Sequence, residues 1–169
     1  MNVFDKAESL MTMNDQTWKR HASPWSVWTR FFTVTPLISL AVWSRVWLGW
    51  YSLVPIGLAL FWTWYNPRAF PIPKSTNNWG AKATFGERVF LERRKVDIPR
   101  HHLRAANVLT LMSLIGSLIW IYGLVSLNFW ATVAGIIGAV LPKAWFCDRM
   151  VWLYEDIKHT DPVYLSWLK

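Results

Sequence analysis

The side chains best suited to chemistry follow the last long apolar stretch of the sequence. Asp148, Trp152, Glu155 and His159 are spaced at i, i+4, i+7 and i+11, so on a helix the other three lie within about 40° of the direction of Asp148. Glu155 and His159, one turn apart, can share a divalent transition metal ion, because carboxylate and imidazole groups both bind such ions. Asp148 would lie about 16 Å from His159 along the helix. Further ligands must therefore come from other segments.

These other segments offer three histidines and one more carboxylate. If they fold together with the end of the last helix, a mixed imidazole and carboxylate site becomes possible. The candidate metal ligands are His21, Glu87, His101, His102, Asp148, Glu155 and His159. The competing interpretation is a solvated helix face, since the sequence contains no H-E-x-x-H, C-x-x-C or paired E-x-x-H motif. The catalytic residues and any cofactor remain unknown.

The adjacent pair His101 and His102 also suggests haem ligation or contact with a quinone. Axial haem ligation needs histidines at matching depth on separate helices, and the second, third and fourth apolar stretches contain no histidine. We therefore favour interfacial histidines and assign no cofactor-binding residue. Whether the protein is an enzyme stays open at this point.

The elements that must position these residues are membrane helices. Hydrophobic residues make up 53% of the chain, which contains 14 Trp, and the charged residues are segregated rather than interspersed. About 20 apolar residues in helical form cross the hydrocarbon core. The uncharged segment 105–142 is too long for one crossing and suits two. The expected spans are residues 25–47, 46–65, 105–126 and 129–147.

The sequence predicts an all-α, four-span transmembrane helical bundle of two hairpins joined by a basic connector, residues 66–104. Lys and Arg are concentrated in this connector and in the two terminal segments, and the expected hairpin turns hold only Arg45. By the positive-inside rule the connector and both termini lie in the cytoplasm, and the protein is integral to the cytoplasmic (inner) membrane. The expected domains are a tail, 1–20, a membrane domain, 21–157, and a tail, 158–169.

The connector is expected to contain a basic amphipathic helix. Trp79, Ala83, Gly86 and Phe90 share one face of it at helical spacing, which is typical of a helix on a membrane surface. Anionic lipid is the expected partner, nucleic acid is not, and a protein partner or a homo-oligomer is possible. The basic residues expected at the membrane interface are Arg30, Arg88, Arg93, Arg94, Lys95 and Lys143.

A structural alternative uses the same charges to attach the connector helix to the bundle. In it Arg30, Lys143 and Arg149 pair with carboxylates, because partly buried charges are normally paired. The expected acidic partners are Glu87, Asp148 and Glu155.

Local signals mark several helix ends. Asn66-Pro67 is expected to end the second span, because proline cannot continue the amide ladder. Asp97 and Pro99 indicate the start of a helix that carries both histidines into the third span. A tight turn is expected near Asn128, and the last helix is expected to fray after Asp156.

Several ordered phrases resemble an uncharacterised family of small prokaryotic integral membrane proteins, a domain of unknown function. The resemblance covers about residues 18–157 and implies a membrane location without an activity. It rests on His21-Ala-Ser-Pro-Trp-Ser-Val-Trp-Thr-Arg-Phe, Trp-Thr-Trp-Tyr-Asn-Pro-Arg ending at Arg68, Gly86-Glu-Arg-Val, His101-His102, and Asp148-Arg-Met-Val-Trp-Leu-Tyr-Glu-Asp.

Three classes of function are compatible with the sequence. The leading one is a non-enzymatic membrane protein that organises partners at the cytoplasmic face. A membrane enzyme with a metal or polar site on that side is the main alternative. A small oligomeric transporter is the third, although the expected spans contain no Asp, Glu or His to bind cations or relay protons.

Overall fold

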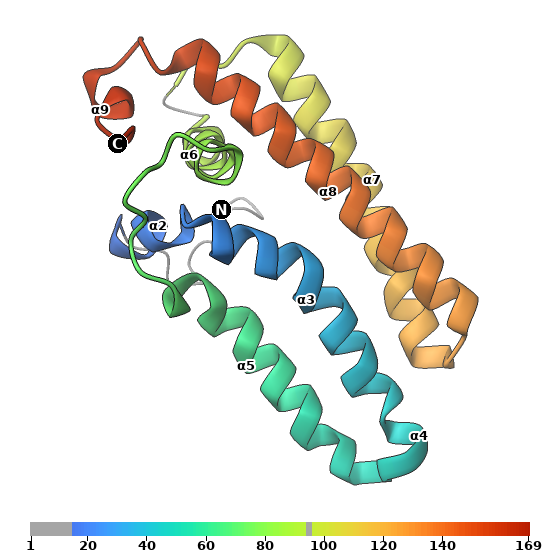
Figure 1. Ribbon diagram of the computed structural model, residues 1–169. Helices are drawn as coiled ribbons and strands as arrows, with labels where there is room; N and C mark the ends of the chain where they lie inside the picture. Colours follow the sequence, from blue (N-terminus) through green and yellow to red (C-terminus); the bar gives the residue numbers. More distant parts are fainter. Residues whose placement is uncertain (1–14, 94–95) are drawn as a thin grey trace. The chain divides into compact units, whose positions relative to one another are not determined.

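The computed structural model describes residues 15–93 and 96–169, and all regular structure in them is helical (Figure 1). The expected all-α class is thus confirmed for these residues. Most of the expected N-terminal tail, residues 1–14, lies outside them. The elements are α2 (Asp15–His21), α3 (Pro24–Trp43), α4 (Arg45–Leu48), the 3-10 helix η1 (Gly49–Ser52), α5 (Leu53–Ala69), α6 (Trp79–Leu91), α7 (Arg100–Ser126), α8 (Phe129–Ile157) and α9 (Pro162–Leu165).

The chain forms two compact units, and it passes from one to the other several times. The polar unit consists of residues 1–28, 67–106 and 146–169. The apolar unit consists of residues 29–66 and 107–145. Arg30, Arg45 and Lys143 are the only charged residues in the apolar unit, and every Asp and Glu among the described residues belongs to the polar unit.

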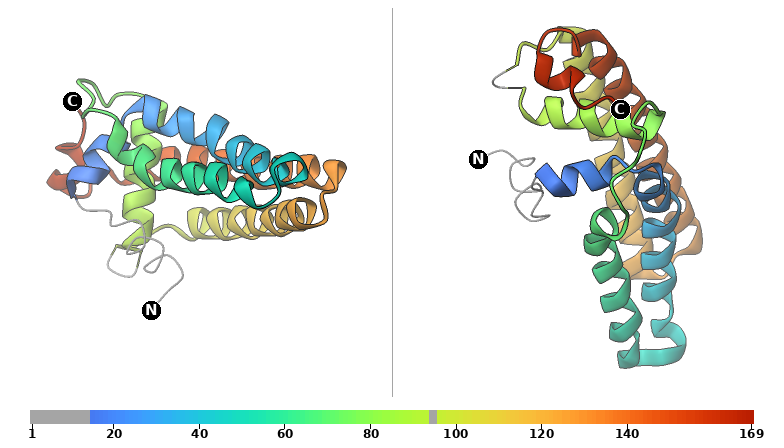
Figure 2. Two further views of the ribbon diagram at one scale, coloured as in Figure 1. Left: turned by 90° about the horizontal axis from the view of Figure 1, so that it is seen from below. Right: turned by 60° about the vertical axis from the view of Figure 1, so that its left-hand side comes forward.

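Three helical stretches in the described residues are long and apolar enough to cross a membrane: Pro24–Ala69, Arg100–Ser126 and Phe129–Ile157. The expected membrane character is therefore supported. The first stretch has 46 residues, and a straight helix of that length would measure about 69 Å, more than twice the hydrocarbon thickness. It is not straight, because α4 and η1 interrupt it and α5 runs back beside α3 (Figures 1 and 2).

Side-chain hydrogen bonds fix the antiparallel register of α3 and α5. The indole Nε1 of Trp62 donates to Thr33 Oγ1 over 3.1 Å, and the Asn66 amide donates to Thr29 Oγ1 over 2.7 Å. Asn66 is fully buried. A buried polar group needs such a partner, so these two bonds favour one alignment of the helices.

The first hairpin turn is wider than the sequence suggests. The expected spans met at residues 46 and 47, whereas α3 ends at Trp43 and α5 begins at Leu53. Gly49 has a φ of +52°, a conformation that glycine adopts without the strain of a side chain. Gly49 directly follows α4 and begins η1, and the chain reverses direction through these two short helices.

Proline 67 does not end the second helix as expected. Helix α5 continues to Ala69 with Pro67 inside it. Pro67 lacks the amide hydrogen that continues the helix ladder, and the helix ends two residues later. Moreover, the Arg68 carbonyl accepts a hydrogen bond from Arg20 Nη1 at 3.3 Å, which gives one carbonyl in the last turn a partner.

The second hairpin is formed by α7 and α8, and its tight turn at Asn128 is confirmed. Leu127 has a φ of 54°, and Asn128 Oδ1 accepts a hydrogen bond from the Ala131 amide at 2.9 Å. The helix backbones approach closely: a Cβ on Gly116 would lie 2.1 Å from the carbonyl carbon of Gly138. Small residues allow such contact between membrane helices.

Hydrogen bonds also connect the two hairpins within the apolar unit. Trp120 Nε1 in α7 donates to Ser39 Oγ in α3 over 2.9 Å. The Arg45 guanidinium donates to the carbonyls of Leu124 and Val125, at 2.6 and 2.5 Å. A cation at the last carbonyls of α7 is favourable, because they carry the negative end of the helix dipole. The two hairpin turns therefore lie at one end of the unit.

Candidate functional site

The polar unit is assembled around the contact of α6 with the last turns of α8. Asn78 begins α6 by accepting a hydrogen bond from the Ala81 amide at 3.0 Å. At Gly86 the two helices nearly touch, since a Cβ there would lie 1.9 Å from the carbonyl oxygen of Met150. Only glycine permits this spacing.

The expected apolar face of α6 is buried in the polar unit by α8. Ala83, Gly86, Val89 and Phe90 are all buried. The Phe90 ring packs edge-on against Phe146 at 5.8 Å between centroids. Helix α6 lies in the expected connector, and these apolar residues are buried within the polar unit.

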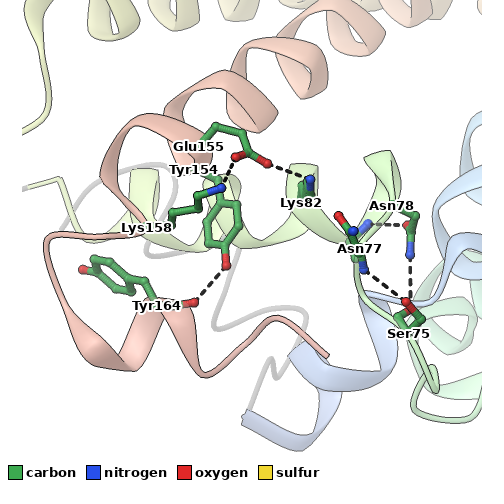
Figure 3. A network of polar contacts seen from close by, with 9 residues as sticks. Ser75, Asn77, Asn78, Lys82, Tyr154, Glu155, Lys158 and Tyr164 are labelled. Atoms are coloured by element: carbon green, nitrogen blue, oxygen red, sulfur yellow. Dashed lines mark hydrogen bonds and ion pairs between the residues drawn. The ribbon is translucent and has the colours of Figure 1, made fainter.

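A cluster of two lysines and one glutamate ties α6 to α8 (Figure 3). Lys82 Nζ lies 2.7 Å from Glu155 Oε1, and Lys158 pairs with the other oxygen of the same carboxylate. Hydrogen bonds from Lys158 and Lys82 hold the pKa of Glu155 below its ordinary value. This carboxylate is already saturated by cations, so it is a poor metal ligand.

The attachment of the connector helix thus uses two of the expected carboxylates and an unexpected cation. Asp148 Oδ1 accepts a hydrogen bond from Trp79 Nε1 at 3.1 Å. The cation on Glu155 is Lys82, which sequence reasoning missed. The guanidinium of Arg149, an expected partner, lies over the Trp152 ring at 4.7 Å.

The segment after α8 folds back onto the polar unit. Tyr154 is buried, its hydroxyl donates to the Tyr164 carbonyl over 2.8 Å (Figure 3), and burial raises its pKa to about 12. Thr76 Oγ1 donates to the Trp167 carbonyl over 2.8 Å and accepts from the Lys169 amide at the same distance. Residues expected to form a tail therefore contribute to the core.

A second polar cluster joins the first turn of α7 to the last turn of α8. His102 Nε2 lies 2.7 Å from Asp156 Oδ2, and the rings of His101 and His102 are 4.1 Å apart. One potential metal-ligating atom from each of His101, His102 and Asp156 lies within 4.8 Å of the other two. His102 is 1% exposed, whereas His101 and Asp156 are exposed.

One atom of this second cluster has no partner. His102 Nδ1 is buried and makes no hydrogen bond with any residue that the structure describes. Buried polar atoms normally have a partner, so this nitrogen distinguishes the cluster from an ordinary ion pair.

The remaining expected ligands lie elsewhere. The ring Nδ1 of buried His21 is hydrogen-bonded to Ser26 Oγ at 2.9 Å. His159 is exposed and lies in a turn that follows the end of α8 at Ile157; the residues beyond Asp156 are ordered here, not frayed as expected. Glu87 is half-buried on α6. In the described part of the chain, the one group of three metal-ligating residues contains only two of the expected seven, His101 and His102.

Sequence reasoning missed Asp156 because the helix face chosen as the candidate site contains Glu155 and not Asp156. Neighbouring helix positions point about 100° apart. Which of the two faces α7 depends on the packing of α7 against α8, and no local pattern reveals that rotation.

The expected interfacial cations have varied surroundings. Arg88 lies over the Trp167 ring at 4.8 Å, and Arg93 Nη1 donates to the Phe90 carbonyl over 3.2 Å. Arg30 and Lys143 are half-buried in the apolar unit. Arg94 and Lys95 lie outside the described residues. Some of these basic groups are thus held by protein contacts.

The polar unit also contains a cavity of about 260 Å³, which the sequence did not reveal. Aromatic rings of Trp18, Phe85 and Trp167 line it, together with the cations Lys19 and Arg88. Its walls come from the N-terminal, connector and C-terminal segments, so only the folded unit creates it.

Comparison with known proteins decides the family. A family of unknown function (DUF6653) matches residues 3–166, nearly the whole sequence. The chain belongs to this family. Membership of DUF6653 confirms the resemblance to a domain of unknown function and supplies no activity. No match was found among the curated proteins or among the solved structures.

Proposed function

We propose that the chain is a four-pass membrane protein with a non-enzymatic role, in which the polar unit organises a partner at the cytoplasmic face. The observation that carries the proposal is the composition of the polar unit. Three segments that are far apart in the sequence, residues 1–28, 67–106 and 146–169, belong to it.

The alternation of units supports the four passes. The segments 29–66 and 107–145 each leave the polar unit and return to it. If the apolar unit lies in the bilayer and the whole polar unit lies on one side of it, each of these two segments must cross the bilayer an even number of times. Two crossings suit the length of each, and the reversals at Gly49 and Leu127 provide the turns.

The charge distribution supports the cytoplasmic side. Arg45 is the only charge near either hairpin turn, while the connector carries nine of the 18 Lys and Arg residues. Basic residues are retained on the cytoplasmic side of the membrane. An exposed cation of the polar unit such as Arg104 would then meet the anionic headgroups of that leaflet.

The organising role is supported by the contacts of the charged side chains in the polar unit, which join its helices to one another. Glu155, Lys82 and Lys158 hold helices together, and Asp148 accepts from Trp79. The apolar unit contains no acid or histidine for coupled transport. A folded unit whose charges serve structure suits protein binding better than catalysis or transport.

Site-specific photocrosslinking in cells tests this role. A photoreactive amino acid is introduced in place of Lys74 or Arg100, both exposed in the polar unit, and in place of Tyr122 in the apolar unit as the control. We expect one discrete adduct of constant mass from the polar-unit positions and none of that mass from position 122. Absence of adducts at both polar positions, with solute flux in protein-containing liposomes, would favour the transporter instead.

A further inference from the structure

The cluster at the start of α7 has the composition of a metal site. Two imidazoles and one carboxylate supply a mixed nitrogen and oxygen set, which suits divalent ions such as Zn²⁺. Their ligand atoms all lie within 4.8 Å of one another. In a tetrahedral Zn²⁺ site with bonds of about 2.1 Å, the ligand atoms lie about 3.4 Å apart, so the three side chains must draw together by an ångström or so to share one ion.

An ion pair alone does not account for the cluster. The contact of His102 Nε2 with Asp156 uses one imidazole nitrogen. It leaves Nδ1 of the same buried ring without a partner in the described chain, and it gives no role to the His101 ring 4.1 Å away. A bound ion would be coordinated by both histidines and the carboxylate together.

The surroundings distinguish Asp156 from its neighbour Glu155. The Glu155 carboxylate is held by Lys82 and Lys158, whereas the Asp156 side chain is 56% exposed and contacts His102. The carboxylate of Asp156 can therefore turn toward an ion without breaking a lysine pair.

The exposure of the three ligands gives an ion a path and an open side. His102 is buried, but His101 and Asp156 are exposed. Three protein ligands with water in the remaining positions are typical of zinc sites that are not purely structural.

We propose that His101, His102 and Asp156 bind one divalent transition metal ion of the Zn²⁺ type, with water completing its coordination. The ion would connect the first turn of α7 to the last turn of α8 inside the polar unit. This inference is independent of the membrane topology and of the partner-organising role.

The test is Zn²⁺ binding by the full-length protein in mild detergent, purified without a histidine tag and dialysed against a chelator. We expect saturable binding of one equivalent. His101→Ala and Asp156→Asn should each weaken binding by about 10-fold or more, because loss of even an outer-shell partner typically costs 10 to 100-fold. Both side chains are exposed, so the variants should fold.

Two controls remove similar groups outside the cluster. His159→Ala removes another exposed histidine, and Glu92→Gln another exposed carboxylate; both should bind Zn²⁺ like the wild type. Co²⁺ provides a second readout, since its visible spectrum should show ligand bands in the wild type that His101→Ala alters. No saturable binding, or equal affinity in the cluster variants and the controls, overturns the proposal.

Discussion

At the scale of single residues, the polar unit depends on side chains whose partners the sequence could not identify. The chemistry-bearing types were recognised, and Asp148, Glu155, His101 and His102 do take part in polar clusters. Lys82 and Asp156 were missed, because their roles depend on how α6 and α7 are rotated about their axes against α8. Local spacing fixes a face of one helix but not the residue opposite to it.

Glu155→Gln should lower the stability of the protein in detergent at neutral pH by about 0.5 to 1 kcal/mol, the usual contribution of partly exposed ion pairs. The pKa of Glu155 is lowered in the folded state. Its stabilisation is therefore present above the unfolded pKa, about 4.3, and is lost as the pH falls through the folded value. Thermal melting at neutral and acidic pH measures this difference.

The matched control is Glu92→Gln, which removes an exposed glutamate that follows α6. Its melting temperature should stay close to that of the wild type at neutral pH. If Glu155→Gln and Glu92→Gln melt together at every pH, the lysine cluster does not attach α6 to α8.

At the scale of helices, the start of α7, the turn at Asn128 and the apolar stretches were predictable because each has a local cause: a preceding proline, a capping amide, an absence of charge. The wide first turn and the continuation of α5 through Pro67 were not. Both depend on tertiary contacts, which outweigh local preference at helix ends.

Gly86→Ala should destabilise the polar unit by about 3 kcal/mol or more, because the new methyl group would overlap the Met150 carbonyl and push α6 away from α8. Gly57→Ala is the matched control, since a Cβ at Gly57 meets nothing within 4 Å. Its melting temperature should be unchanged or slightly higher. Equal melting of the two variants in detergent would show that the close contact does not exist.

Gly116→Ala applies the same test to the apolar unit, where a methyl group would lie 2.1 Å from the Gly138 carbonyl carbon. We expect a loss of similar size, because the backbones of α7 and α8 cannot separate without losing the packing that holds membrane helices together. The measurement is again melting beside Gly57→Ala. A wild-type melting temperature would contradict the close packing of this hairpin.

At the scale of the whole molecule, the chain leaves the polar unit twice, in the apolar segments 29–66 and 107–145, and returns to it each time. The polar unit thus brings together segments from the start, middle and end of the chain. Hydropathy and charge predicted the two apolar segments, because their apolar character follows from composition. The way in which the three segments fold together could not be read from them. It depends on long-range contacts such as Gly86 with Met150 and Thr76 with Trp167.

The most direct test of the four-pass topology is the labelling of single cysteines with a membrane-impermeant maleimide, in a Cys147→Ser background. Trp50→Cys and Ser126→Cys, near the two hairpin turns, should be labelled in intact cells. Gln16→Cys, Ser75→Cys and Thr160→Cys, one in each segment of the polar unit, should be labelled only after the membrane is opened. If the cysteine at position 75 were labelled in intact cells and the cysteine at position 16 were not, the chain would cross the membrane an odd number of times between them. That result would contradict the four-pass topology.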